Sequence, residues 1–306
     1  HGPHLAALRQ HWKKRRPNMP ETAPPAKKPQ QIVLIGGAMR SGTTAIHRAL
    51  CTAQNSNPYI AESWFLHGIM DLFRSSLSRY DLGLADQFGD RKNFIELMKF
   101  NIQYYFNIVS AKYGDPDVLI FKHPALTRHF IEIGEMFPQV RFLVVVRDPR
   151  DVIASMKEVS EKHRQDGIAS LHSNLTTTAD FCGQYGSYYG ALLRNPGKLA
   201  NRLTFVRYED VMSAPQESIA KIGAIFGANY VAGDIAQFNE QHASSSYLNK
   251  DERLKDPFSR AFWSDMYTKE LSSEKIGRYR ASLAPAEIKE IERLLRPIGA
   301  RFQYWS

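Results

Sequence analysis

A glycine-rich segment at residues 36–44 follows directly on an apolar run at residues 32–35. An apolar strand that ends in glycines and continues into a helix is typical of the phosphate-binding loop, G-x-x-x-x-G-K-[ST]. This segment keeps both glycines of that pattern and its last threonine, but Thr43 stands where the lysine belongs. The nearest cation is Arg40, inside the loop. The segment therefore predicts a strand–loop–helix unit that holds an anion without the lysine that serves a nucleoside triphosphate.

The residue types of this loop suit an anion for two reasons. Glycines permit tight turns and close approach of the backbone. The helix that we expect to open at Thr43 or Thr44 directs its first amides and the positive end of its dipole at the ligand. The alternative interpretation is an ordinary glycine-rich turn capped by a threonine. The candidate anion-binding residues are Gly37, Ala38, Met39, Arg40, Ser41, Gly42, Thr43 and Thr44.

The net charge of +9 is unevenly distributed along the chain. Residues 1–29 carry +6 of it, with several prolines and little apolar content, which predicts a basic, disordered tail. That tail could act at an anionic surface or be an inert, solvated arm. Residues 30–306 carry the remaining +3 and form the one folded domain that we expect. The charge therefore gives no reason to expect a nucleic-acid partner.

The two cysteines, Cys51 and Cys182, indicate neither a disulfide framework nor a metal site. No run approaches the roughly 18–20 apolar residues that a membrane span requires. No secretory signal is visible either, so we expect a cytoplasmic protein without a membrane span. Nothing in the sequence indicates the oligomeric state.

Four continuous apolar runs rich in β-formers predict buried parallel strands. They lie at residues 31–35, 118–121, 141–146 and 203–206. Amphipathic patterns predict helices between and after these strands. They lie at residues 93–112, 149–159, 218–226 and 285–296. Strands that alternate with helices imply a three-layer α/β fold, with a central parallel sheet flanked by helices on both faces.

Ligands in such folds bind beyond the carboxyl ends of the strands. Three candidate segments lie at such ends: the loop at residues 36–44, the pair Lys122 and His123, and residues 147–150. In the last of these, we expect Asp148 to cap a helix whose first residue is a proline. Residues 238–270 have weak periodicity and predict either a mobile flap over the site or a plain long loop.

These segments resemble motifs of the PAPS-dependent sulfotransferase family, in which 3′-phosphoadenosine 5′-phosphosulfate (PAPS) donates a sulfuryl group and leaves as PAP. Residues 37–44 are similar to the family's loop for the 5′-phosphosulfate, and residues 142–155 resemble its segment for the 3′-phosphate. The resemblance implies that Arg147 and Ser155 hold that phosphate. It covers roughly residues 30–300 and implies a P-loop-like fold.

Two further segments resemble the family less specifically. Residues 207–210 are similar to another strand end of the family. Residues 276–280 resemble its late region of glycine, aromatic and basic residues, which closes on the nucleotide. These likenesses imply nucleotide contacts for Tyr208 and Arg278.

The chemistry of sulfuryl transfer is compatible with the missing lysine. A sulfuryl group in transfer carries less negative charge than a phosphoryl group, so it has less need of a divalent cation, and we expect no metal. Catalysis then depends mainly on positioning and charge stabilisation. We expect Arg40 to neutralise the 5′-phosphate and the sulfuryl oxygens, and Lys122 to contact the leaving oxygen. Lys122 could instead be an ordinary exposed lysine.

The acceptor must lose a proton to a general base, and two residues compete for that role. Glu62 matches the place where the tyrosylprotein and some carbohydrate branches of the family keep a glutamate. The sequence thus resembles these and the bacterial branches more than the cytosolic small-molecule ones. His123 is similar to the histidine of the latter, but there lysine and histidine are two residues apart, and adjacent strand residues point to opposite faces. We favour Glu62. Otherwise Glu62 is a surface carboxylate, and His123 a hydrogen-bonded residue before Pro124.

The leading hypothesis is therefore an enzyme of the EC 2.8.2 type that moves a sulfuryl group from PAPS to a hydroxyl or an amine. One rival is a P-loop kinase-like phosphoryl transferase, which the missing lysine disfavours. The other is a non-catalytic nucleotide-binding module. Glycan, peptide, lipid and small-molecule acceptors all stay open, because residues 63–113 and 160–200 would form the acceptor pocket.

Overall fold

The computed structural model describes residues 30–230, 255, 260 and 271–306. The predicted tail at residues 1–29 lies outside these residues, as does nearly all of the predicted flap or loop at residues 238–270.

Four parallel strands form one sheet in the order β2-β1-β3-β4. Their bounds are β1 (Gln31–Gly37), β2 (Val118–Lys122), β3 (Arg141–Val146) and β4 (Leu203–Arg207). All four strands that the sequence predicts are confirmed. β1, β2 and β4 run slightly further than predicted, so the strand β1 includes the first two glycines of the loop segment.

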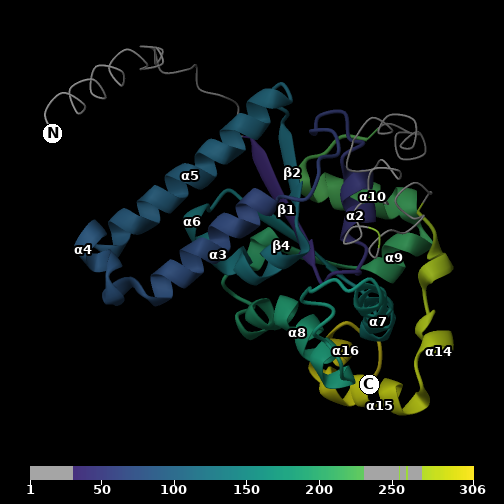
Figure 1. Cartoon of the computed structure of the whole chain (residues 1–306). Coiled ribbons are helices and arrows are strands. Elements are labelled where there is room, and N and C mark those ends of the chain that lie inside the picture. Colours follow the sequence, from purple (N-terminus) through teal and green to yellow (C-terminus); the bar gives the residue numbers. More distant parts are fainter. Residues whose placement is uncertain (1–29, 231–254, 256–259, 261–270) are drawn as a thin grey trace, which may run out of the picture.

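Alternate residues of each strand enter two different cores, as the pleat of a strand requires. Ile32 and Leu34 of β1 pack into the first core, while Val33 and Ile35 pack into the second. The sheet thus lies between α2 and α10 on one side and α3 and α5 on the other (Figure 1). This arrangement confirms the predicted three-layer α/β fold.

The helices of the first core come from most of the chain. They include α3 (Trp64–Ser78), α5 (Arg91–Lys112), α6 (Phe130–Met136), α7 (Pro149–Gln165), α8 (Thr178–Arg194), α14 (Tyr279–Ser282), α15 (Pro285–Leu294) and α16 (Arg296–Arg301). The second core is closed by α2 (Thr43–Leu50), α9 (Tyr208–Ser213) and α10 (Pro215–Phe226). The short helices η1 (Tyr80–Leu82) and α4 (Leu84–Phe88) connect α3 to α5, and η2 (Pro124–His129) follows β2.

The start of α7 follows its predicted turn chemistry. Asp148 accepts a hydrogen bond from the Arg150 amide at 2.9 Å, which is the expected N-cap, and Pro149 is the first helical residue.

The helix predicted at residues 285–296 divides instead into α15 and α16, because Leu295 leaves helical geometry just before Pro297.

The helix α3 was not predicted from the sequence, although it lies beside the site. Leu66, Met70 and Phe73 of α3 are buried, but Trp64 and Leu72 are more than half exposed. Apolar residues therefore occur on more than one face, and that blurs the single apolar stripe by which a surface helix is recognised.

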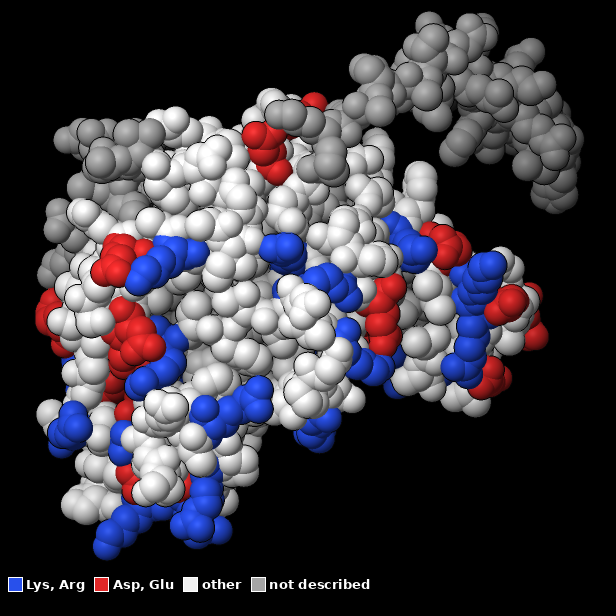
Figure 2. All heavy atoms as spheres, turned by 180° about the vertical axis from the view of Figure 1, so that it is seen from behind, with Lys and Arg blue, Asp and Glu red and all other residues white. Residues whose placement is uncertain are grey.

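None of the helices in the described part of the chain is long and apolar enough to cross a membrane. On the face seen in Figure 2, basic and acidic side chains lie interspersed among uncharged ones. The cytoplasmic location stays a prediction.

Candidate functional site

The strand register brings the candidate segments to one edge of the sheet. Ile35 of β1 pairs with Lys122 of β2, and Gly37 pairs with Val145 of β3. Because the four strands are parallel, the loops that follow them meet beyond their carboxyl ends. The glycine-rich loop lies in the middle, since β1 is an inner strand.

The glycine-rich loop turns through two left-handed residues. Arg40 has φ 68° and Gly42 has φ 90°. Successive residues with alternating backbone handedness can form a concave group of amides that binds anions. A side chain at position 42 would also collide with Tyr208, because an added Cβ would lie 2.4 Å from its ring. The helix α2 opens at Thr43, as predicted.

Buried hydroxyl groups fix the first half of this loop. The Gly37 amide donates to Thr127 Oγ1 at 2.6 Å, and the Ala38 amide donates to Tyr189 Oη at 2.8 Å. The Ser41 hydroxyl is fully buried and donates to the Ala38 carbonyl at 2.6 Å. These groups therefore shape the loop from within. The first amides of α2 have no carbonyl partner inside the helix and are therefore suited to bind an anion.

The two predicted phosphate-binding segments contact each other. Arg40 Nε donates to Ser155 Oγ at 3.0 Å, and Arg147 donates to the Arg40 carbonyl at 3.3 Å. The predicted 5′-phosphosulfate loop and the predicted 3′-phosphate segment therefore lie in direct contact with each other.

Arg147 is a nearly buried cation whose hydrogen-bonding capacity is only partly used. Its guanidinium lies 4.4 Å from the centre of the Tyr208 ring and donates to the Lys275 carbonyl at 2.5 Å. Asp151 lies 3.6 Å away. The Nε atom is buried and has no hydrogen-bond partner among the described residues. An arginine in this state is suited to bind an anion, because its Nε–H donor has no acceptor.

Asp151 attaches the late segment of the chain to the site. Its carboxylate accepts hydrogen bonds from the Gly277 amide at 2.7 Å and the Tyr279 amide at 2.9 Å. Arg278, for which we predicted a nucleotide contact, lies between these two residues in the chain, and it is exposed. Sequence reasoning gave Asp151 no role. Its position in the first turn of the helix that follows Arg147 was the signal available.

Lys122 and Glu62 form an ion pair at the end of β2. Lys122 Nζ lies 2.5 Å from Glu62 Oε1 and donates to Thr44 Oγ1 at 2.8 Å. Lys122 has no exposed surface, and 16% of the Glu62 side chain is exposed. The alternatives of an exposed lysine and a surface carboxylate are therefore wrong.

His123 lies on the other side of Glu62, with Nε2 3.9 Å from Glu62 Oε2. The two adjacent side chains point to opposite faces, as expected, yet both approach Glu62. Lys122 extends toward α2, whereas His123 contacts Trp64 of α3. The Glu62 loop lies across the strand end, where the Ser63 amide donates to the Lys122 carbonyl at 2.9 Å, so Glu62 reaches both side chains.

The tautomer of His123 follows from its hydrogen bond. Its Nδ1 accepts from the Ala125 amide at 3.2 Å, so the proton of the neutral ring is on Nε2. Burial, partly opposed by the Glu62 charge, lowers the pKa of His123 to about 3. The ring is therefore neutral at pH 7 and presents a donor toward Glu62.

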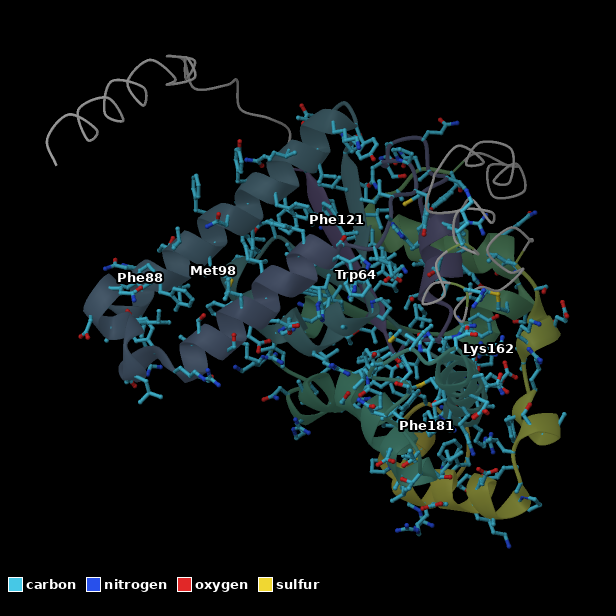
Figure 3. The ribbon with its side chains drawn as sticks, viewed as in Figure 1. Trp64, Phe88, Met98, Phe121, Lys162 and Phe181 are labelled. Carbon is cyan, nitrogen blue, oxygen red and sulfur yellow. The ribbon has the colours of Figure 1, made fainter. Side chains whose placement is uncertain are left out.

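Aromatic rings form the wall next to this pair. The rings of Trp64 and His67 lie 4.4 and 4.5 Å from that of His123. Trp64 begins α3 near the sheet (Figure 3). It is 59% exposed. Trp64 was not among the site residues predicted from the sequence, although its position two residues after the candidate base Glu62 was a usable signal.

Comparisons with known proteins identify the family to which this fold is similar. Residues 32–231 match the sequence model of a family described as "Sulfotransferase family". The sulfotransferase domain from the curacin biosynthetic pathway has a TM-score of 0.54 at 14% identity, covering 89% of this chain and 99% of that chain. The sulfotransferase domain from the Synechococcus PCC 7002 olefin synthase has a TM-score of 0.49 at 17% identity, covering 89% and 97%.

A third similar structure is mouse sulfotransferase SULT7A1 complexed with PAP, with a TM-score of 0.47 at 14% identity, covering 92% of this chain and 90% of that chain. At these identities, structural likeness bears on the fold alone. A search of curated proteins found no match.

Proposed function

This chain belongs to the sulfotransferase family and is therefore an enzyme of sulfuryl transfer, and we propose that its donor is PAPS and its acceptor a hydroxyl or an amine. The observation that carries the choice of donor is the contact of Arg40 with Ser155 and Arg147. This contact joins the glycine-rich loop, which is suited to bind one phosphate, to Arg147, which is suited to bind a second phosphate. PAPS is charged at both its 3′ and 5′ positions and so matches a site with two anion-binding parts.

The proposed donor position follows from the predicted roles. The glycine-rich loop and α2 hold the 5′-phosphosulfate, with Arg40 neutralising its charge. Arg147 and Ser155 hold the 3′-phosphate. Tyr208 lies between these two parts, under the Arg147 guanidinium and against Gly42. Arg278, exposed at the rim, closes on the nucleotide.

We assign the general base to Glu62. In the transfer step, an S–O bond forms to the acceptor oxygen while the S–O bond to the 5′-phosphate breaks and PAP leaves. The acceptor proton passes to Glu62 and from there to solvent. Lys122 stabilises the charge that develops on the leaving oxygen. To do so, the Lys122 ammonium leaves Glu62 and contacts the donor.

The tautomer of His123 favours Glu62 over His123 as the base. The atom that His123 presents to the site is Nε2, and it carries the proton because Nδ1 accepts from the Ala125 amide. The Nε2 atom of the neutral His123 ring already carries a proton, so it has no free lone pair with which to take a second proton from the acceptor. His123 serves instead as a donor toward Glu62 or toward the acceptor oxygen.

The proposed charge stabilisation comes from Arg40 and Lys122, so we expect turnover to continue in the presence of a chelator. The acceptor binds beside Trp64, on the side of Glu62 that faces α3. This position lies in the segment at residues 63–113, from which we expected the acceptor pocket.

Calorimetric titration tests this function. We expect PAP to bind at least about 10-fold more tightly than adenosine 5′-phosphate, because one charged hydrogen-bonded contact contributes at least roughly 1.5 kcal/mol. A kinase-like transferase would instead prefer ATP with Mg²⁺ over PAP, and that preference would refute the proposal. Labelled PAPS incubated with a panel of alcohols, phenols, glycans and amines would then identify the acceptor.

A further inference from the structure

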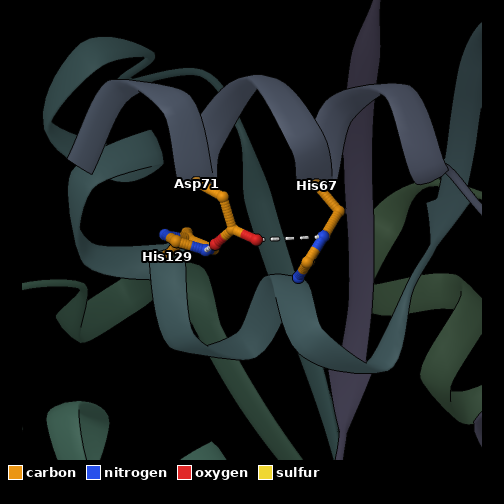
Figure 4. A group of neighbouring side chains, drawn as sticks. All are labelled: His67, Asp71 and His129. Atoms are coloured by element: carbon orange, nitrogen blue, oxygen red, sulfur yellow. Dashed lines mark hydrogen bonds and ion pairs between the residues drawn. The ribbon is translucent and has the colours of Figure 1, made fainter. Parts of the chain in front are cut away.

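Three side chains that the proposed function does not use converge beside the site. His67 and Asp71 lie one turn apart on α3, and His129 is the last residue of η2 (Figure 4). His129 Nε2 lies 2.8 Å from Asp71 Oδ1, and His67 Nδ1 lies 3.5 Å from Asp71 Oδ2. One ligand atom from each residue lies within 4.8 Å of the other two.

These separations are close to those that a metal ion requires. Ligand atoms at about 2.0–2.1 Å from a tetrahedral Zn²⁺ are about 3.3 Å apart. Asp71 makes its contacts of 2.8 and 3.5 Å through its two different oxygens, and these distances lie on either side of that value. The helix holds His67 and Asp71 four residues apart, so that both project from one face. Side-chain rotations would bring the three ligand atoms, which lie within 4.8 Å of one another, around one ion.

The ligand types select a class of metal. Two imidazoles with one carboxylate suit zinc and other first-row transition ions, whereas Mg²⁺ and Ca²⁺ prefer oxygen ligands.

The surroundings of the three residues permit entry of an ion. The Asp71 side chain is 58% exposed, so water can reach the cluster and fill the remaining coordination positions. Two cations lie nearby, but both have other partners. Arg74 pairs with Glu132, and the Arg128 guanidinium lies 4.4 Å from the centre of the Tyr188 ring.

We propose that His67, Asp71 and His129 bind one divalent first-row transition-metal ion on the acceptor side of the site. The ion would fix the His67 ring, which lies 4.5 Å from the ring of His123, and His123 in turn neighbours the proposed base Glu62. The site is separate from the nucleotide loops, and it can be tested on the protein alone. A purely internal hydrogen-bond network is the competing interpretation.

The test uses the full chain after treatment with a chelator and its removal. ZnCl₂ is titrated calorimetrically, and CoCl₂ is added in parallel to record the visible spectrum of the bound ion. We expect one ion per chain. Asp71→Asn should weaken binding at least about 10- to 100-fold, since loss of even an outer-shell partner of a metal costs that much. Asp71 is exposed, so this variant should fold.

The control variant is Asp86→Asn, which removes an exposed carboxylate from α4 and should bind zinc as the native chain does. Zinc should also raise the Tm of the native chain and of this control, but not that of Asp71→Asn, because only a ligand bound to the folded state stabilises it. Failure of the native chain to bind zinc stoichiometrically would overturn the proposal. Equal zinc affinity in Asp71→Asn and the native chain would also overturn it. Neither result bears on the choice of PAPS.

Discussion

Lys122 Nζ lies 2.5 Å from Glu62 Oε1 at the carboxyl end of β2. Lys122 is the last residue of β2, and Glu62 lies 60 positions earlier, in the loop before α3. One is the group that we expect to stabilise the leaving oxygen, and the other is the proposed base. The two opposite charges are therefore paired before the substrates bind.

Glu62→Gln should lower turnover by about 10²- to 10⁴-fold, which is the usual contribution of a general base. The affinity for PAP should stay within a few-fold, because Glu62 lies on the acceptor side. His123→Asn should cost much less. Initial rates with labelled PAPS, together with PAP titration, measure both effects. Glu96→Gln, at an exposed position on α5, is the control. If Glu62→Gln kept normal turnover, the base would be elsewhere.

The ion pair should show strong coupling in a double-mutant cycle of Glu62→Gln and Lys122→Met. Removing one partner of a buried pair leaves an uncompensated charge and costs up to about 3–5 kcal/mol, whereas removing both can be nearly neutral. The double variant should therefore unfold at a higher urea concentration than Glu62→Gln alone.

The exposed pair Lys198 and Glu135 supplies the matched control, for which the coupling should be about 0–1 kcal/mol. Additive losses in the buried pair would show that Lys122 and Glu62 do not depend on each other.

Arg147→Ala should weaken binding of PAP about 10- to 150-fold, and binding of adenosine 5′-phosphate much less. The range corresponds to roughly 1.5–3 kcal/mol for a hydrogen bond to a charged group. Arg194→Ala, an exposed arginine on α8, is the control for charge alone. Parallel calorimetric titrations with the two nucleotides give the ratio. The assignment of the 3′-phosphate to Arg147 fails if both nucleotides lose the same factor.

Gly42→Ala should cost more stability than Gly114→Ala, although both glycines have positive φ, 90° and 76°. Left-handed backbone alone costs an L-residue about 1–2 kcal/mol. At position 114 an added Cβ meets nothing within 4 Å, whereas at position 42 it lies 2.4 Å from the Tyr208 ring. Gly42→Ala should also reduce PAP affinity at least about 10-fold, the factor that roughly 1.4 kcal/mol represents. Equal effects of the two substitutions on urea unfolding and PAP binding would contradict this account of the loop.

The stability should fall as the pH is lowered from 6.5 to 4, in part because of His172. Burial, with repulsion from His163 and Arg40, lowers the pKa of His172 to about 4. In this pH window the unfolded chain binds a proton at His172 that the folded chain does not, so the free energy of unfolding rises with pH. His172→Gln should reduce the slope by at most about 1.4 kcal/mol per pH unit. Urea unfolding from pH 4 to pH 8 tests this, since above pH 7 the slopes of variant and native chain should agree.

The sequence alone determined the strands, the loop between β1 and α2, and the cap of α7. Each of these rests on residues that are neighbours in the chain: an apolar run, a glycine with positive φ, or an aspartate before a proline. Local preferences decide such features whatever the rest of the fold does. The helix α3 was missed because its apolar residues are split between the core and the surface.

The tertiary structure decided which of those residues meet. Arg40 contacts Ser155 115 positions away, and Asp151 binds the Gly277 amide 126 positions away. His129 approaches Asp71 across 58 positions. Such contacts depend on strand order and on where each connection crosses the carboxyl edge of the sheet, and no local pattern encodes either. Glu62 reaches both Lys122 and His123 for the same reason, because its loop lies across the end of β2.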